Sequence, residues 1–532
     1  MTGTLKFLPT GNTNIDTLST GSKWNVDTGG TITWGVGVHD YYWSTWQVDI
    51  INRAFAEWEA VIDVKFQYTG SYRDYRDSRP DIMLSLVNKE YLPPLTEAAS
   101  LIPDSVNADS FALGKGQNNW TWPHPEGDIF FNVQGDKWSW FDVGDKYYTK
   151  ASADIFFDTV LHEIGHSLGL KHPHEDKFDG FPTFQAVDRS LYDSKLLTLM
   201  SYKGSTVAAT PLPIDIYAAQ GIYGANTKNE AGDNLYYLSE DNLVRTIYDV
   251  SGIDTLNALA LDNGITLKLN QGSSSMISPT TWVHIPFGII IENAKGTIYD
   301  DVISGGRGAN VISGMWGNDI IFGLEGNDTL NGDHGDDTIF ADGGSDTITG
   351  GVGLDTIKYP LARENYTLAN VAESSASILE IIKGTTDNIN TVERLSFSDV
   401  NVALDIAAKP GEAYRLYKAA FDRAPDLVGL GFWIKALDNG ETALKMASEF
   451  NSSPEFISLY GANNSNDDYL NLLYNNVLDR DGDPGGHAFW LGHLNAGSVT
   501  RERLLIDFSE SVENQANVVD LIANGIDYMP YG

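Results

Sequence analysis

Up to Asn226, hydrophobic residues follow helix-like and strand-like spacings in turn. Residues 45–60 place apolar side chains at intervals of three and four residues, which predicts a helix with one buried face. That face consists of Val48, Ile51, Ala54, Phe55 and Trp58. A second helix is predicted over residues 154–169, and strands are predicted over residues 31–37, 63–69, 81–87 and 127–132. This mixture predicts an α+β domain that ends near residues 223–226.

A repeat with a period of nine residues follows a stretch of short β segments at residues 234–295. Its units open at Gly296, Gly305, Gly314, Gly323, Gly332, Ala341 and Gly350. The sixth residues are Asp301, Asn310, Asp319, Asp328, Asp337, Asp346 and Asp355. The eighth residues are Ile303, Ile312, Ile321, Leu330, Ile339, Ile348 and Ile357. The pattern predicts a parallel β-roll in which the sixth residue binds calcium and the eighth points inward. A flexible linker would need no aliphatic residue at each eighth position.

Some units depart from this pattern. Asn310 replaces an acidic residue, Ala341 replaces an opening glycine, and the first unit lacks two of its later glycines. We therefore expect the calcium sites near the first two units to be weak or empty. Residues 359–406 resemble irregular β structure.

From about residue 410 the spacing becomes helical, and a second repeat appears with an offset of 57 residues. Tyr417 corresponds to Tyr474, and Trp433 corresponds to Trp490. This predicts two similar helical units, with both tryptophans in their core. The fold class expected is thus an α+β domain, a parallel β-roll and an α-helical C-terminal domain.

Charge and composition narrow the classes of function. The chain has 35 Lys and Arg against 72 Asp and Glu, a net charge of −37, which argues against binding to nucleic acid or to anionic membranes. It has no cysteine, so disulfides and thiol catalysis are excluded. The N-terminal residues do not read as a secretory signal peptide, and no apolar run is long enough to span a membrane. Export would need another signal.

The strongest chemical signal is the run His-Glu-Ile-Gly-His-Ser-Leu-Gly-Leu-Lys-His, which begins at His162. Residues four apart share a helix face, so His162 and His166 can bind one metal ion. Glu163 then lies beside the metal and is placed to act as a general base. Gly169 can end the helix with a positive φ, which brings back His172 as a third ligand. Three protein ligands leave one position open, as in catalytic zinc sites.

This run is identified as the signature of the metzincin proteases. Met200 matches the methionine turn of that clan. Tyr202, two residues later, resembles the serralysin subgroup, in which this tyrosine is an extra metal ligand. Residues 127–132, 214–226 and 291–294 also resemble serralysins, and the resemblance covers about residues 12–360.

The resemblance implies a secreted zinc endopeptidase with one catalytic zinc ion and several structural calcium ions. Zinc would activate a water molecule, Glu163 would act as the general base, and Tyr202 would donate to the oxyanion. The resemblance also implies further calcium ligands at Asp249, Asp254 and Glu292. Export through type I secretion machinery, with folding in external calcium, is implied in the same way.

We divide the chain into an N-terminal segment (1–20), a catalytic domain (21–230), a calcium-binding β-roll region (231–408) and a helical domain (409–532). The first segment is either a short propeptide or part of the mature protein. The last resembles helical repeats of exported RTX and surface-layer-associated bacterial proteins, which leaves a surface partner open. We expect a monomer with protein or peptide substrates. Residues 108–126 precede the strand that should border the cleft, and their tryptophans either shape substrate choice or serve packing. We interpret His124 and His174 as non-ligands.

Three functions stay open at this point. The first is a broad-specificity extracellular endopeptidase. The second is a non-catalytic surface or matrix protein that kept the zinc fold, against which the intact Glu163 argues. The third is a protease with one dedicated target, such as the surface layer of its host.

Overall fold

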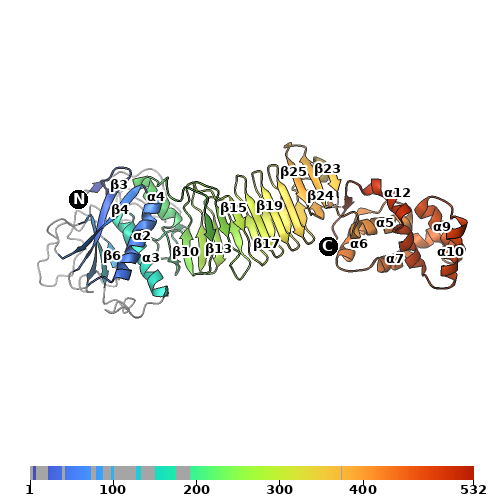
Figure 1. Ribbon diagram of the computed structural model, residues 1–532, viewed down its shortest axis with the longest axis horizontal. Helices are drawn as coiled ribbons and strands as arrows, with labels where there is room; N and C mark the ends of the chain where they lie inside the picture. Colours follow the sequence, from blue (N-terminus) through green and yellow to red (C-terminus); the bar gives the residue numbers. More distant parts are fainter. Residues whose placement is uncertain are drawn as a thin grey trace. The chain divides into compact units, whose positions relative to one another are not determined.

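The computed structural model describes residues 4–6, 22–38, 42–73, 80–87, 98–100, 128–132, 150–174, 192–372 and 374–531. The chain divides into two compact units (Figure 1). The first comprises Met1–Thr255 and Thr266–Ile291, and the second comprises Leu256–Ile265 and Glu292–Gly532. Within the described residues, no helix combines the length and the apolar character that crossing a membrane requires.

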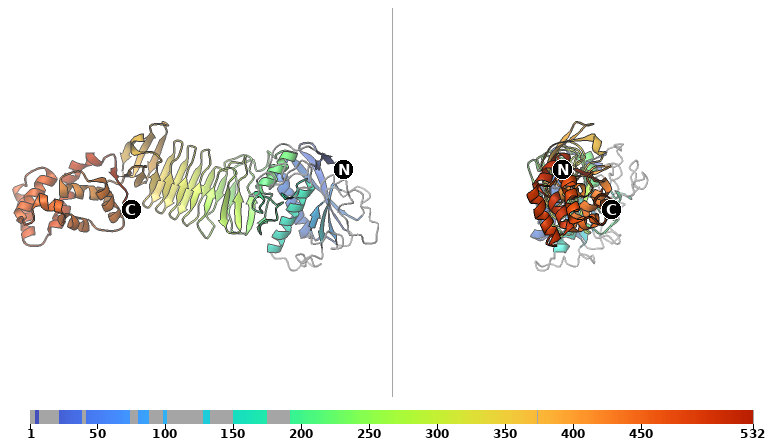
Figure 2. Two further views of the ribbon diagram at one scale, coloured as in Figure 1. Left: turned by 180° about the vertical axis from the view of Figure 1, so that it is seen from behind. Right: turned by 90° about the vertical axis from the view of Figure 1, so that its right-hand side faces the viewer.

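The first unit contains a five-stranded sheet covered by helices. The strand order is β4 (Val64–Tyr72), β3 (Gly30–Gly37), β5 (Ile82–Val87), β7 (Ile129–Asn132) and β6 (Ala98–Ser100). All neighbours are parallel except β6 and β7. Helices α2 (Thr45–Val61) and α3 (Lys150–Ser167) lie side by side against this sheet, as both views show (Figures 1 and 2). The short strands β1 (Thr4–Lys6) and β2 (Ser22–Trp24) form an antiparallel pair.

The predicted buried face of α2 is confirmed. Ile51, Ala54, Phe55 and Trp58 are buried, and Val48 packs partly buried against the same core. The indole nitrogen of Trp58 donates a hydrogen bond of 3.1 Å to the carbonyl oxygen of Leu161 in α3. Because that bond lies one residue before the first histidine of the motif, core packing fixes the position of the histidine-bearing helix.

The remaining elements of the first unit follow the motif. They are β8 (Val207–Ala208), α4 (Pro213–Tyr223), β9 (Leu235–Tyr237), β10 (Leu243–Thr246), β12 (Thr266–Lys268), β13 (Ser274–Ser278) and β14 (Thr281–His284). Strands β13, β14, β10 and β8 form a sheet in that order. Strand β11 (Thr255–Asn257) spans the boundary between the two units.

The second unit contains the predicted parallel β-roll. One sheet contains β15 (Asn293–Lys295), β17 (Val311–Trp316), β19 (Thr329–His334), β21 (Thr347–Val352) and β25 (Thr386–Asn390). The other contains β16 (Val302–Ser304), β18 (Ile320–Phe322), β20 (Thr338–Phe340), β22 (Thr356–Lys358) and β26 (Arg394–Ser396). Figure 1 shows the first set stacked as successive rungs. All seven aliphatic residues at the eighth position are completely buried, since they fill the space between the sheets.

One insertion interrupts the roll after its repeats, and a further strand follows its last rung. The 3₁₀-helix η4 (Arg363–Asn365) and the antiparallel strands β23 (Tyr366–Ala372) and β24 (Ser375–Glu380) stand between β22 and β25. Strand β27 (Asn401–Ala403) then pairs antiparallel with β26. The roll therefore resumes for one further rung after the insertion.

The C-terminal region is helical, as predicted. Its helices are α5 (Lys409–Phe421), α6 (Leu427–Asp438), α7 (Ala443–Asn451), α8 (Pro454–Tyr460), α9 (Asn466–Leu478), α10 (Pro484–Asn495), α11 (Arg501–Ser509) and α12 (Val512–Ile522). The bounds of α9 and α10 repeat those of α5 and α6 at an offset of 57 residues. Strand β28 (Ile526–Tyr528) was not predicted, because three residues are too few to show a period; it pairs antiparallel with β27.

Candidate metal centre

Helix α3 presents the first half of the motif. His162, Glu163 and His166 are all buried on it, within the last two turns. Gly169 follows with a φ of +96°, a conformation that a side chain would strain. The amide of Gly169 donates to the carbonyl oxygen of His166 at 2.9 Å, which closes the helix. The chain then turns back and brings His172 toward the helix, as the spacing predicts.

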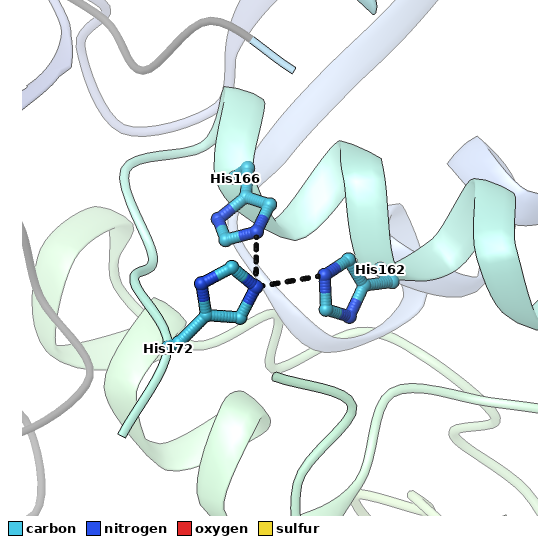
Figure 3. Close-up of side chains that lie close together, drawn as sticks. All are labelled: His162, His166 and His172. Carbon is cyan, nitrogen blue, oxygen red and sulfur yellow. Dashed lines mark hydrogen bonds between the residues drawn. The ribbon is translucent and has the colours of Figure 1, made fainter. Parts of the chain in front are cut away.

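The three imidazoles converge through their Nε2 atoms (Figure 3). Nε2 of His172 lies 3.1 Å from Nε2 of His166 and 3.3 Å from Nε2 of His162. A tetrahedral zinc ion with bonds of about 2.0–2.1 Å would separate its ligand atoms by roughly 3.3 Å. The donor set and its spacing therefore fit a zinc ion. Within the described part of the chain, this is the one group of three or more histidine or acidic side chains whose ligand atoms lie close enough together for a metal ion.

Backbone carbonyl groups fix the orientation of two ligands. Nδ1 of His162 bonds to the carbonyl oxygen of Leu199 at 2.8 Å, and Nδ1 of His166 bonds to that of Leu170 at 2.9 Å. A carbonyl oxygen accepts only, so Nδ1 carries the proton in both rings and Nε2 presents its lone pair. Both rings are therefore oriented for metal binding before any ion arrives.

Asp215 holds the segment that supplies one of these carbonyl groups. It is fully buried in the first turn of α4, and it accepts from the amide of Leu199 at 2.6 Å and from Oγ1 of Thr198 at 2.5 Å. Burial raises the pKa of its carboxyl to about 7, although these hydrogen bonds favour the charged form. The sequence showed Asp215 only as a polar residue in an apolar helix, so its role was not predicted.

Met200 lies beneath the histidine-bearing helix and is completely buried. A Cβ atom added to Gly165 in α3 would stand 3.0 Å from Sδ of Met200 and 3.3 Å from the ring of Trp58. Because that contact is tighter than ordinary packing, Gly165 lets α3 approach the methionine closely. This position suits the methionine turn expected from the sequence.

Tyr202 reaches the open side of the cluster. Its hydroxyl lies 2.6 Å from Nε2 of His172, and 62 % of its surface is exposed. Asp193 anchors both of its neighbours: it accepts from Oγ of Ser201 at 2.7 Å and pairs with Nζ of Lys203 at 2.6 Å. The backbone of the tyrosine is thus held while its side chain faces solvent.

The other predicted features of this region lie at its edge or beyond it. The ring of His174 is exposed and stacks 5.4 Å from that of His172, outside the metal cluster. His124 and the rest of residues 108–126 lie outside the described residues. Of residues 1–20, only 4–6 are described. The propeptide and cleft interpretations therefore stay predictions.

The sixth residues of the roll form a hydrogen-bonded ladder. The backbone N–H of each donates to the side-chain Oδ1 of the sixth residue 18 positions later, at 2.7–2.9 Å. The donors are Asp301, Asn310, Asp319, Asp328 and Asp337. All seven sixth residues are buried. Buried carboxylates in register need a counter-charge.

Four of these carboxylates have one oxygen that accepts no hydrogen bond within the described residues. Oδ2 of Asp319, Asp328, Asp337 and Asp355 is buried and accepts no hydrogen bond from the described residues. Burial raises the pKa of Asp319 to about 8, of Asp328 and Asp355 to about 7, and of Asp337 to about 6. Oxygen ligands with this unrelieved charge fit calcium.

In the first two units, groups of the protein form hydrogen bonds with the side chain of the sixth residue. Asp301 accepts from the amide of Thr297 at 2.5 Å and from that of Ile265 at 2.8 Å. Nδ2 of Asn310 donates to the carbonyl oxygen of Glu292 at 2.7 Å. The side-chain N–H of Asn310 thus occupies the place beside this carbonyl oxygen that a cation would occupy if the sixth residue were an aspartate. These contacts agree with weak or empty sites there, which stay a prediction.

The three acidic residues expected before the repeats are placed in different units. Asp249 and Asp254 are buried in the first unit. Glu292 belongs to the second unit, where it begins the longer of its two segments. Oδ2 of Asp249 accepts from the hydroxyl of Tyr236 at 2.6 Å. Oδ1 of Asp254 accepts from the amide of Asn234 at 2.8 Å. Their ligand roles stay predictions.

The ladder also continues beyond the residues that the sequence indicated. The amide of Asp346 donates to Oδ1 of Asp387 at 3.0 Å, and the amide of Asp355 donates to Oε2 of Glu393 at 3.0 Å. The insertion of η4, β23 and β24 breaks the period of nine, so both acidic residues were missed. The only signal was an acidic residue two positions before an aliphatic one, which is too common to be specific.

Known families match three parts of the chain. Residues 23–192 match the matrixin family. Residues 295–330 and 322–357 match the RTX calcium-binding nonapeptide repeat. Residues 447–518 match a domain of unknown function, DUF4214.

Curated relatives are similar over about a third of the chain. The metallopeptidase AprA of Pseudomonas marginalis is 35 % identical over 206 residues, which are 33 % of this chain and 43 % of the relative. Serralysin C of Dickeya chrysanthemi is 32 % identical over 199 residues, 32 % of this chain and 41 % of the relative. The chain thus spans about two fifths of the length of these relatives. The chain thus combines a region similar to matrixins and serralysins, RTX calcium-binding repeats and a C-terminal DUF4214 domain, and this combination supports a resemblance to serralysin-type RTX metalloproteases.

Proposed function

We propose that this protein is a zinc-dependent endopeptidase that hydrolyses extracellular proteins. The observation that carries the proposal is the convergence of three histidine Nε2 atoms. Glu163 lies on α3, the helix that carries two of these histidines. A structural zinc site would have a fourth protein ligand of the usual kind, whereas this cluster leaves its fourth side to an exposed tyrosine.

His162, His166 and His172 would hold the zinc ion through Nε2. The zinc ion, when bound, activates water and polarises the carbonyl group of the scissile peptide bond. Glu163 takes a proton from the attacking water onto a carboxylate oxygen and passes it to the amine nitrogen as the C–N bond breaks. Its buried position on α3 keeps the carboxylate beside the ligands.

Tyr202 would stabilise the negative charge that develops on the carbonyl oxygen of the substrate. Its hydroxyl is 2.6 Å from His172, so it can compete for the open side of the site and move away when a peptide binds. The exposed ring gives the side chain room for this motion, while Asp193 holds the backbone on both sides. Hydroxyl donors of this kind stabilise an oxyanion.

The expected need for calcium also supports an extracellular location. The roll buries carboxylates whose charge calcium would neutralise, and weak oxygen sites of this kind fill at the high calcium concentrations found outside cells. Export through type I secretion machinery, and a surface partner for residues 409–532, are further proposals that rest on the resemblance to serralysins.

Casein hydrolysis by the purified full chain, with zinc and calcium present, tests the proposal. Glu163→Gln should keep bound zinc, measured by elemental analysis, but should lose at least roughly 100-fold in rate because the general base is gone. Glu364→Gln changes an exposed glutamate in the second unit and should keep the full rate.

Equal and negligible activity of the wild type and of Glu163→Gln, with one zinc ion bound to each, would sink the proposal. It would favour the non-catalytic surface protein. Cleavage of a single surface-layer protein with no cleavage of casein would instead narrow the substrate class to a dedicated target.

A further inference from the structure

The loops on one side of the roll share a pair of oxygens. A Cβ atom built on Gly332 would lie 2.2 Å from Oδ2 of Asp337 and 2.6 Å from the carbonyl oxygen of Gly350. On Gly314 it would lie 2.1 Å from Oδ2 of Asp319 and 2.9 Å from the carbonyl oxygen of Gly332. Each loop thus brings its own carboxylate oxygen close to a carbonyl oxygen of the next loop.

The same pair recurs once more, beyond the matched repeats, which end at residue 357. A Cβ atom on Gly350 would lie 2.5 Å from Oδ2 of Asp355 and 2.1 Å from the carbonyl oxygen of Thr391. Thr391 stands opposite Gly350 in the register, because β25 continues the sheet with Asn390 opposite Thr349. Its carbonyl group therefore stands where the next repeat would have supplied one.

A second carboxylate completes this end. Glu393 takes the place of the sixth residue, since β26 continues the sheet with Arg394 opposite Thr356. Its Oε2 accepts the amide of Asp355 at 3.0 Å, as each sixth residue does for the one before it. Asp355 is 1 % exposed, and its Oδ2, aimed toward Thr391, accepts no hydrogen bond from the described residues. Two carboxylates and a carbonyl group are hard oxygen ligands for a cation.

We propose that a calcium ion binds at this C-terminal end of the roll, with Asp355, the carbonyl group of Thr391 and Glu393 as ligands. The site lies outside the nonapeptide repeats and would close the roll on this side. Its second half contains three residues, 391–393, in place of a six-residue loop, so Glu393 supplies with a longer side chain what the missing loop would have supplied.

The other side of the roll ends differently. There Oδ1 of Asp387 accepts the amide of Asp346 at 3.0 Å, and Oδ2 accepts the hydroxyl of Tyr359 at 3.1 Å. Both oxygens are therefore satisfied by the protein, and no ion is expected. Asp387 and Glu393 occupy equivalent positions in the ladder with the same charge, so they make a matched pair.

Native mass spectrometry of the full chain, which counts calcium ions per folded molecule, tests the proposal. Glu393→Gln keeps an acceptor for the amide of Asp355 but loses the charge, and should bind one calcium ion fewer than the wild type. Asp387→Asn should bind the same number as the wild type. Glu393→Asp keeps the charge but is shorter, and should lower the affinity of one ion at least tenfold in a calcium titration.

An unchanged calcium count in Glu393→Gln would overturn the proposal. Loss of an ion from both Glu393→Gln and Asp387→Asn would overturn it too, because the effect would then belong to the ladder in general. Since the method counts ions in the folded population alone, a partly unfolded variant still gives a decisive count. If Glu393→Gln has no folded population, unchanged affinities in Glu393→Asp overturn the proposal and a single weakened ion supports it.

Discussion

Asp215 does not touch the metal ligands, yet its two oxygens organise the segment that orients one of them. It accepts from Leu199, whose carbonyl group accepts from Nδ1 of His162. A histidine ligand binds metal best when its second nitrogen is held in this way, because the ring then loses less freedom on binding. The carboxylate thus acts on the zinc site through one backbone group.

We therefore expect Asp215→Asn to weaken zinc binding. The amide group has one acceptor where the carboxylate has two, and its NH₂ group would face the backbone N–H of Leu199 or the hydroxyl of Thr198. Changes of this kind typically cost about 10–100-fold in metal affinity. Competition with a zinc chelator measures the affinity, and Asp262→Asn, at an exposed position, is the control. Equal affinities of the two variants would contradict the role given to Asp215.

Residues of the metal centre differ in how well their roles can be predicted from sequence. His162, His166 and Glu163 lie on one helix, where spacing alone sets direction, so their placement could be predicted. The position of His172 followed from Gly169 and its positive φ. Asp215 acts across a fold contact between distant segments, and no periodicity reports such contacts.

At the scale of elements, the roll was predictable where its period is strict. Each unit repeats the same local contacts, so one turn determines the next. The end of the roll was not predictable, because η4, β23 and β24 interrupt the period while the sheets continue through β25 and β26. Register is restored by backbone pairing of distant segments, which leaves little trace in the sequence.

At the same end of the roll, a buried arginine pairs with acidic residues that include one of the helical region. Arg394, in β26, is 3 % exposed and pairs with Asp405 and with Asp438 of α6, the latter at 2.9 Å. Burial raises the pKa of Asp405 to about 6, although Arg394 lowers it. Removing the guanidinium would leave two carboxylates without their partner in a poorly hydrated place.

We expect Arg394→Met to destabilise the second unit by roughly 3 kcal/mol, the usual cost of breaking a buried ion pair on one side. Arg503→Met breaks the exposed pair with Asp507 and should cost less than about 1 kcal/mol. Urea unfolding followed by circular dichroism, with calcium in excess, gives both free energies of unfolding. Losses of similar size in the two variants would show that burial of Arg394 has no special effect.

On the scale of the whole molecule, the two compact units have different sources of stability. The first has an apolar core built around Trp34, Phe55 and Trp58. The roll also buries aliphatic residues, but beside them it buries a row of carboxylates, four of which have a second oxygen that accepts no hydrogen bond from the described residues. Apolar burial needs no ligand, whereas buried like charges must be neutralised by protons or by cations.

Calcium removal should therefore unfold the roll and leave the first core folded. We expect dialysis into calcium-free buffer at pH 8, with free zinc held constant, to abolish the protection of amides in β17, β19 and β21 in hydrogen-exchange mass spectrometry. Amides of α2 and α3 should stay protected, because their packing involves no carboxylate of the ladder. Restored calcium should return protection to the strands.

The loss of protection should also depend on pH. Protons can replace cations on carboxylates with a raised pKa, and the pKa values are about 8 for Asp319 and about 7 for Asp355. The strands should therefore lose less protection at pH 6 than at pH 8. Equal loss of protection in helices and strands would contradict a separate calcium dependence of the roll.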